Sequence, residues 1–258
     1  PRHVRYKHSD HPVLNGTGDN GVSLQAMTER WDSCICAESA HSNVYDSGAP
    51  DRLGGLTRLT VPTALGKLTP ELVDRQAWGW GNEHRAQPKV VSITQSTELG
   101  TLYSVEEIAS IVEDAHGHDM LVHLDGARIA NAAAALDVPL RAFTTDLGVD
   151  VVSYGGTKNG LMMGECVVVI DPGAVRGTEY LRKLSMQLAS KMRFVSVQLD
   201  ALLSDDLWLR TASHAHVMAA RLDAAVPAVH GDRAQPPVPP PPVGAIPPPP
   251  VRQAPSKR

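Results

Sequence analysis

Short runs of β-branched and apolar residues, separated by stretches with helical periodicity, constrain the fold of this chain more than any other feature. The runs cover residues 33–37, 89–93, 121–124, 151–153 and 166–170, and several are apolar almost throughout. Strands of this kind are buried on both faces of a sheet. Because the runs alternate with helical patterns, the sequence predicts an α/β domain with a mostly parallel mixed sheet.

Helical signals occupy the intervals between these runs. Ser104 and Glu107 form a capping box ahead of apolar residues spaced three and four apart. Residues 128–136 are rich in alanine, and residues 20–30 are also predicted to be helical. A last long helix is expected to run from a cap at 204–206 to about residue 226. In sheets of this class, ligands bind beyond the carboxyl ends of the strands.

Composition divides the chain near Pro227, since 12 of its 20 prolines lie from that residue onward. Such a tract forms neither helix nor sheet interior and is expected to be extended or disordered. A ligand for a polyproline-binding domain is the functional alternative. We therefore predict a partial N-terminal segment at 1–12, one large domain at 13–226 and a proline-rich tail at 227–258.

Charge and cysteine content exclude several classes of function. The net charge is −4 without a basic stripe, so nucleic acid is not an expected partner. No apolar run approaches the ~18–20 residues of a membrane helix, and the first residues show no secretory signal. The three cysteines are too few for a disulfide framework, which favours a cytoplasmic protein. Cys34 and Cys36 lack the further ligands that a metal site needs, so no metal is expected.

A glycine-rich turn and an aspartate at the end of a strand are the first two candidate site features. Residues 15–18 (Asn-Gly-Thr-Gly) precede a predicted helix, where backbone amides and the Thr17 hydroxyl can approach a phosphate. A plain glycine turn is the alternative. Asp125 ends the run at 121–124, and a carboxylate there can hold a pyridine nitrogen protonated, with Gly126 leaving room for a flat ring. An aspartate that caps the next helix is the alternative.

Lysines supply the other candidates. Lys158 follows the run at 151–153 in a loop with three glycines. It could bind phosphate, although the GxxxxGK[ST] pattern is absent, or it could be a solvated loop lysine. The spacing of Asp125 and Lys158, each at the end of a strand, favours a Schiff-base lysine instead. Lys183 and residues 191–193 lie on a predicted polar helical stretch, which either supplies cations to a ligand or is merely solvated.

Taken together, these residues resemble the L-threonine aldolase family, within the aromatic amino-acid β-eliminating lyase/threonine aldolase group of fold-type-I pyridoxal phosphate (PLP) enzymes. The resemblance covers about residues 11–226. It implies a PLP-dependent transferase-like large domain, with the family's small C-terminal domain missing from this chain. Its motifs lie at 15–18, 40–44, 54–56, 66–71, 92–98, 123–128, 155–160 and 187–194.

The resemblance also implies an activity and a role for each candidate residue. The reaction is PLP-dependent retro-aldol cleavage of L-threonine or L-allo-threonine to glycine and an aldehyde, in a homodimer or homotetramer. Arg193 is expected to act across a subunit boundary. The implied roles are Lys158 for the internal aldimine, Asp125 for the pyridinium nitrogen, His41 for stacking on the ring, Gly16, Thr17 and Arg193 for the phosphate, and Arg128 and Lys183 for the substrate.

The chain departs from the family pattern beside the stacking histidine. Members usually carry an aspartate four residues after it, where this chain has Tyr45 followed by Asp46. Glu98 occupies a position where one branch of the family has a histidine. We hypothesise that Asp46 or Glu98 organises the proton transfer from the substrate hydroxyl. With the second domain missing, we expect an incomplete active site. A β-eliminating lyase and a cofactor-binding remnant with little activity are the alternatives.

Overall fold

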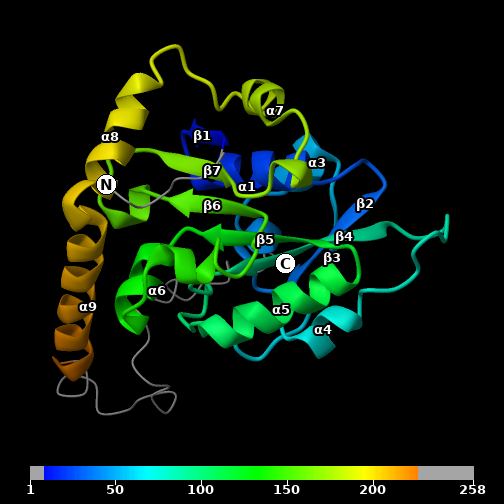
Figure 1. Ribbon diagram of the computed structural model, residues 1–258, viewed down its shortest axis with the longest axis horizontal. Coiled ribbons are helices and arrows are strands. Elements are labelled where there is room, and N and C mark those ends of the chain that lie inside the picture. Colours follow the sequence, from blue (N-terminus) through cyan, green and yellow to red (C-terminus); the bar gives the residue numbers. More distant parts are fainter. Residues whose placement is uncertain (1–8, 226–258) are drawn as a thin grey trace, which may run out of the picture.

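A seven-stranded mixed sheet forms the centre of the computed structural model, which describes residues 9–225 (Figure 1). The strand order is β1-β7-β6-β5-β4-β2-β3. The strands from β3 to β6 in this order run parallel, whereas β7 is antiparallel to β6 and β1 is antiparallel to β7. The expected mostly parallel sheet is therefore confirmed. The bounds are β1 Ser9–Val13, β2 Asp32–Ala37, β3 Thr57–Val61, β4 Gln87–Thr94, β5 Leu121–Gly126, β6 Val151–Gly155 and β7 Glu165–Val169.

Helices cover both faces of the sheet and create two hydrophobic cores. The smaller core lies beneath α1 (Gly16–Ala26), α3 (Ala49–Gly54) and α7 (Thr178–Leu184). The larger core lies on the other face. Neighbouring residues of β4 enter different cores, since Val90 belongs to the smaller and Val91 to the larger. Strands that are buried in this way on both faces read as continuous apolar runs.

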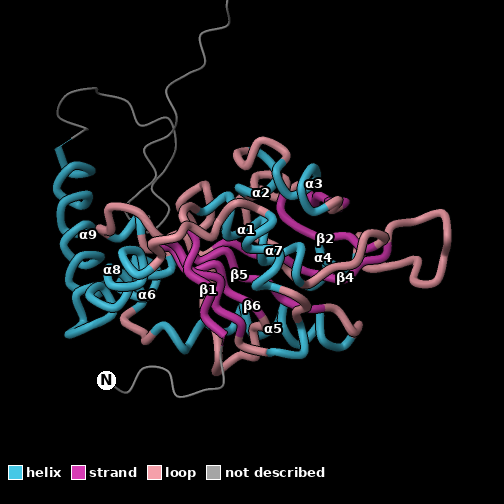
Figure 2. The backbone as a smooth tube through the Cα atoms, turned by 90° about the horizontal axis from the view of Figure 1, so that it is seen from above, coloured by secondary structure: helices cyan, strands magenta, loops and turns pink. Residues whose placement is uncertain are grey.

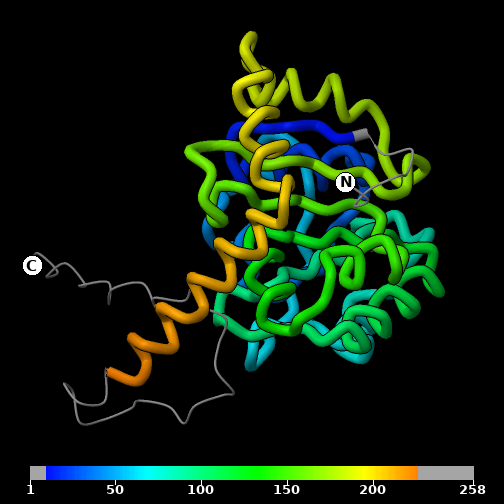
Figure 3. The backbone as a smooth tube through the Cα atoms, turned by 60° about the vertical axis from the view of Figure 1, so that its left-hand side comes forward, coloured from blue at the N-terminus to red at the C-terminus, as the bar shows by residue number. Residues whose placement is uncertain are grey.

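The larger core is covered by the helices α5, α6, α8 and α9 and by the short helix α4. Figure 2 shows α5 alongside the sheet, while α6, α8 and α9 gather at one end of the molecule. In Figure 3 the C-terminal turns of α9 project beyond the sheet. Trp208 and Ala212 bury the first half of α9 against this core, and His216 Nε2 lies 2.8 Å from the carbonyl oxygen of Asn131. The bounds are α4 Pro70–Asp74, α5 Val105–Gly117, α6 Ile129–Leu136, α8 Arg193–Leu203 and α9 Leu207–Ala225.

Several boundaries differ from those predicted. Helix α1 begins at Gly16, four residues before the expected start, because the Asn15 side chain accepts a hydrogen bond from Gly18 N at 2.8 Å and caps the helix. The capping box of Ser104 and Glu107 at the start of α5 is confirmed. Strand β1 begins at Ser9 and pairs with β7, and the predicted domain bounds stay a prediction. Residues 1–8 and 226–258, and with them the expected tail, lie outside the described part of the chain.

Two helix predictions are wrong. The single helical stretch expected around 183–193 is two helices, because α7 ends at Leu184 and α8 begins at Arg193, with Met186 between them at a φ of 60°. A left-handed residue cannot continue a right-handed helix. The long helix expected after residues 204–206 is confirmed as α9, but the cap predicted at Ser204 does not form, since Ser204 Oγ donates to Asp200 O and Asp205 has a φ of 50°. None of the helices between residues 9 and 225 combines the length and the apolar character that a membrane crossing requires.

Candidate active site

Five of the predicted residues lie at or just after the ends of strands that meet at the same edge of the sheet. His41 begins α2 (His41–Val44) shortly after β2, and Glu98 follows β4. Asp125 lies near the end of β5 and Arg128 precedes α6. Lys158 is in a short 3-10 turn, η2 (Thr157–Asn159), after β6. The parallel arrangement therefore places these side chains where ligands bind in such sheets.

Asp125 is a buried carboxylate with both oxygens hydrogen-bonded. Its Oδ1 accepts from Ala127 N at 3.0 Å, and its Oδ2 accepts from Asn20 Nδ2 at 3.0 Å. The side chain of Gly126, had it one, would lie 2.9 Å from the carbonyl oxygen of Ser153. The glycine is therefore needed for the close approach of β5 and β6, and not only for room above a ring as the sequence had suggested.

The buried side chain of His123 connects the strands around Asp125 through hydrogen bonds. It lies two residues before Asp125 on the same face of β5, with Ser92 Oγ 2.9 Å from its Nδ1 and Ser153 Oγ 2.9 Å from its Nε2. Burial lowers the pKa of His123 to about 4, so its ring is neutral. A neutral imidazole has one donor and one acceptor, and the two hydroxyls satisfy both. The network joins β4, β5 and β6 without placing a charge beneath Asp125.

His41 and Asp46 form an ion pair that the sequence alone did not predict. His41 Nδ1 lies 2.9 Å from Asp46 Oδ1, and this hydrogen bond raises the pKa of His41 more than burial lowers it. Burial raises the pKa of Asp46, but hydrogen bonds from His41, Thr17 and Asn20 outweigh it and leave that pKa below its usual value. Asp46, one position after the place where the resemblance implies an aspartate, therefore reaches the histidine.

Glu98 contacts the backbone of His41. Its Oε1 accepts a hydrogen bond from the backbone N of His41 at 3.0 Å. Burial, followed by the negative charge of Asp125, raises the pKa of Glu98 to about 6, while nearby Arg128 opposes the shift. A carboxylate with this pKa can exchange a proton near neutral pH. Asp46, whose oxygens are occupied by Thr17, His41 and Asn20, is less able to do so.

Lys158 is accessible from solvent. Its pKa is nevertheless lowered, first by partial burial of its amino group and then by the positive charge of Arg128. The negative charges of Asp125, Glu165 and Glu98 act in the opposite direction. Glu165, at the start of β7, is buried and accepts a hydrogen bond from Gly156 N at 2.5 Å. This contact fixes the turn that carries Lys158. A lysine with a lowered pKa has a larger fraction of the neutral, nucleophilic amine.

The amino end of α1 faces the same site. Thr17 Oγ1 donates to Asp46 Oδ1 at 2.7 Å, and a side chain at Gly16 would meet nothing within 4 Å. The neighbouring Asp19 does not face the turn, because its side chain is buried and accepts a hydrogen bond from Ser23 Oγ. Burial raises the pKa of Asp19 well above its usual value. The turn at 15–18 is therefore open, and the Asp19 carboxyl points away from it.

Gln187, in the segment between α7 and α8, packs directly on this turn. Its Oε1 accepts from Leu14 N at 3.0 Å, and a side chain at Gly18 would lie 2.1 Å from its carboxamide carbon. Lys183 and Arg193, near the two ends of that segment, are exposed. Within residues 9–225 no side-chain hydrogen bond or ion pair joins either of them to Asp125 or Lys158, and Arg193 instead lies over the ring of Phe194. Their roles stay predictions.

Sequence reasoning missed three residues of this site. Asn20 bridges two carboxylates, Glu165 fixes the lysine turn, and Gln187 contacts the glycine turn. Asn20 had a usable signal, since it lies one helical turn after Thr17 and shares its face. Glu165 acts across the antiparallel pair β6 and β7, nine residues from Gly156, and Gln187 acts on a segment far away in the sequence. Neither contact follows from helical or strand periodicity.

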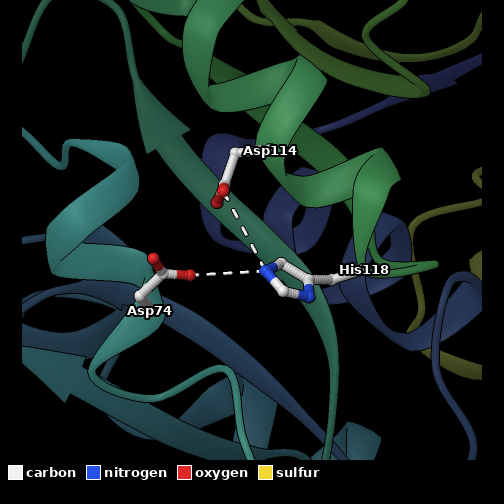
Figure 4. A group of neighbouring side chains, drawn as sticks. All are labelled: Asp74, Asp114 and His118. Carbon is white, nitrogen blue, oxygen red and sulfur yellow. Dashed lines mark ion pairs between the residues drawn. The ribbon is translucent and has the colours of Figure 1, made fainter.

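Two polar features lie away from the site. A cavity of about 750 Å³ is lined at the opposite end of α1 by residues that include Gln25, Glu29 and Arg52. His118 Nε2 lies 3.3 Å from Asp74 Oδ1 and 4.0 Å from Asp114 Oδ1 (Figure 4). All three side chains in this second group are partly exposed, and their ion pairs connect the end of α4 to the end of α5.

The sequence of this chain is similar to one known protein family and to several known proteins. The model of the family described as beta-eliminating lyase matches residues 4–238. A low specificity L-threonine aldolase from Pseudomonas aeruginosa is 38% identical over 221 residues, which are 84% of this chain and 64% of the relative. Another from Pseudomonas sp. (strain NCIMB 10558) is 37% identical over 220 residues, with coverages of 85% and 64%. The chain thus spans slightly less than two thirds of the length of these relatives.

A solved structure supports the same comparison. A threonine aldolase from Leishmania major superposes with a TM-score of 0.81 at 27% identity, over 87% of this chain and 65% of that one. The expected fold-type-I large domain is confirmed by this likeness. Helices on both faces of a mixed sheet are therefore arranged as in a known fold.

Proposed function

The chain belongs to the beta-eliminating lyase family, and from this premise we propose that it is a PLP-dependent carbon–carbon lyase that cleaves L-threonine or L-allo-threonine to glycine and an aldehyde. Two relatives named low specificity L-threonine aldolase support this substrate class. The observation that carries the proposal is the convergence of Lys158, Asp125 and His41 at the carboxyl edge of the sheet.

The donor set of this edge fits PLP. Asp125 offers a fixed carboxylate to a ring nitrogen, and the open turn at Gly16 and Thr17 offers backbone amides to a phosphate. Lys158 supplies the amine that holds the cofactor's aldehyde carbon, and His41 supplies a ring to lie against the cofactor. PLP, when bound, draws the electron pair of the broken bond into its ring. The chain's own residues must then hold the substrate and move its protons.

We assign Arg128 to the substrate carboxylate and Glu98 to the substrate hydroxyl. Arg128 makes no ion pair with a carboxylate among residues 9–225, although its charge acts on Glu98 and Lys158. Holding a carboxylate there orients the bond to be broken. Glu98, with its pKa of about 6, accepts the hydroxyl proton, and Asp46 acts indirectly by holding His41. Lys183 and Arg193 are assigned only as additional cations near the substrate and phosphate.

The test uses the purified chain with added PLP. We expect a visible absorbance band from the lysine-bound cofactor, which is lost in Lys158→Ala, and release of an aldehyde and glycine from L-threonine or L-allo-threonine. A β-eliminating lyase would release a 2-oxo acid and ammonia from L-threonine or L-serine instead. Cofactor binding without either product would identify a cofactor-binding protein with little activity. An unchanged spectrum in Lys158→Ala would contradict the role of this lysine.

We further propose self-association and a cytoplasmic location. Four large apolar residues have more than half of their surface exposed: Leu184 at the end of α7, Met186 just beyond it, and Phe194 and Val197 on α8. Such a surface favours burial against another copy of the chain. Its position would bring Arg193 to a subunit boundary. The location is supported by three cysteines that are free and buried, as in a reducing compartment.

A further inference from the structure

Asn20 lies at the junction of two carboxylates that come from different parts of the chain. It sits in the second turn of α1, and only 3% of its surface is exposed. Its Nδ2 donates to Asp125 Oδ2 at 3.0 Å and to Asp46 Oδ2 at 3.2 Å. One amide nitrogen therefore connects the carboxylate assigned to the ring nitrogen with the carboxylate that holds His41.

The chemistry of the neighbours fixes the orientation of this amide. A carboxylate is an acceptor only, so the NH2 group must face Asp46 and Asp125; the reverse orientation would place Oδ1 against both negative charges. In the described part of the chain, Oδ1 is buried without a partner. Leaving a buried acceptor unsatisfied costs free energy. The two charge-assisted hydrogen bonds outweigh that cost, which indicates that this side chain is fitted to the carboxylate pair.

The contacts on each carboxylate define what Asn20 controls. Asp125 has one oxygen held by Ala127 N and the other by Asn20, so its plane is fixed at both ends. Asp46 has Oδ1 shared by Thr17 and His41, and Asn20 supplies a donor to its Oδ2. Removal of Asn20 would release one oxygen of each carboxylate while leaving the rest of the site in place.

We propose that Asn20 is a positioning residue that sets Asp125 toward the cofactor's ring nitrogen and, through Asp46, sets His41 against its ring. This inference rests on the proposed PLP-dependent function. It assigns one side chain to two cofactor contacts, at the edge and at the face of the same ring. A residue that only packs α1 against the sheet would have no such joint effect.

The test compares Asn20→Leu, which keeps the branched shape of the side chain and removes both N–H donors, with Ser23→Ala one turn further along α1. Ser23 is also buried and hydrogen-bonded, but to Asp19 and Ser153 and not to Asp46 or Asp125. Circular dichroism checks that each full chain folds. The first readout is the titration of the Asp46 carboxyl by carbon-13 NMR without cofactor. The second is the dissociation constant of PLP from its absorbance.

In Asn20→Leu we expect the Asp46 titration to move to higher pH, because a donor to its charged form is lost. The groups that act on this carboxyl are His41, Thr17 and Asn20. We expect PLP binding to weaken by about 10- to 100-fold, since one hydrogen bond to a charged group is lost at each carboxylate. Ser23→Ala should leave both readouts close to those of the unmodified chain. Asn20→Ala serves if Asn20→Leu does not fold.

Each contrary result has a distinct meaning. An unchanged Asp46 titration, or equal weakening of PLP binding by Asn20→Leu and Ser23→Ala, would overturn the positioning role. If the unmodified chain bound no PLP while its Asp46 titration still depended on Asn20, the proposed function would fail, and Asn20 would keep its hold on the carboxylate but lose its link to the cofactor.

Discussion

At the scale of the residue, Glu98 gives a direct expectation for the pH dependence of activity. Its pKa is raised to about 6, so below that pH it is protonated and cannot accept the substrate proton. We expect kcat/KM for L-threonine to rise with pH through about 6. Glu98→Gln should lose this rise, and its kcat/KM should be at least about 100-fold lower than that of the unmodified chain. The measurement is a pH profile of kcat/KM.

Asp46→Asn is the matched control for this profile. Asp46 is not among the groups that shift the pKa of Glu98, so this variant should lower the rate while keeping the limb near pH 6. If the limb persisted in Glu98→Gln and vanished in Asp46→Asn, the assignment of the two carboxylates would be reversed.

Individual residues also show where the sequence was informative. The positions of Lys158, Asp125 and His41 could be predicted, because each lies at or just after the end of a strand and sits in a recognisable motif. The contact between Asp46 and His41 could not, since it depends on how a turn folds back: Asp46 N donates to His41 O, which returns the Asp46 side chain to the His41 ring. A shift of one residue is decided by that turn geometry and not by the spacing alone.

At the scale of the element, strands buried on both faces were predictable and edge strands were not. Strands β4 and β5 are apolar runs, whereas β1 contains Pro12 and lies at one edge, and β3 contains Arg58 and lies at the other. Edge strands tolerate proline and charge because they bury one face less and have unpaired backbone groups on one side. Their sequences therefore lack the continuous apolar pattern.

The contact between α1 and the α7–α8 segment yields a second prediction. A side chain at Gly18 would meet the Gln187 carboxamide, which must swing away and lose its hydrogen bond with Leu14 N. Gly21 lies on the same helix, and a side chain there would meet nothing within 4 Å. We expect Gly18→Ala to have a free energy of unfolding about 1 kcal/mol lower than that of Gly21→Ala, as measured by urea denaturation.

A double-mutant comparison identifies the cause of that difference. In a Gln187→Ala background the two alanine substitutions should become equivalent, because the group that Gly18→Ala displaces is gone. Gly21→Ala itself should be neutral or stabilising, since glycine costs roughly 0.5–1 kcal/mol relative to alanine within a helix. A difference that survived in the Gln187→Ala background would mean that the α7–α8 segment does not rest on this turn.

At the scale of the whole molecule, the apolar surface around α7 and α8 predicts the state of assembly. Met186 is 74% exposed and Phe194 is 57% exposed, and Figure 1 shows α7 and α8 in the upper part of the view, joined by the segment that carries Met186. A monomer gains nothing from exposing such residues, whereas two copies can bury them. We expect light scattering to give a mass of at least two 27.6 kDa chains, and Phe194→Glu to reduce it to one.

Leu136→Glu, on α6, should leave the mass unchanged, because that residue lies outside this surface. If the Phe194→Glu chain stayed associated, the contact between copies would have to be sought on another face, and Arg193 would lose its expected place at a subunit boundary.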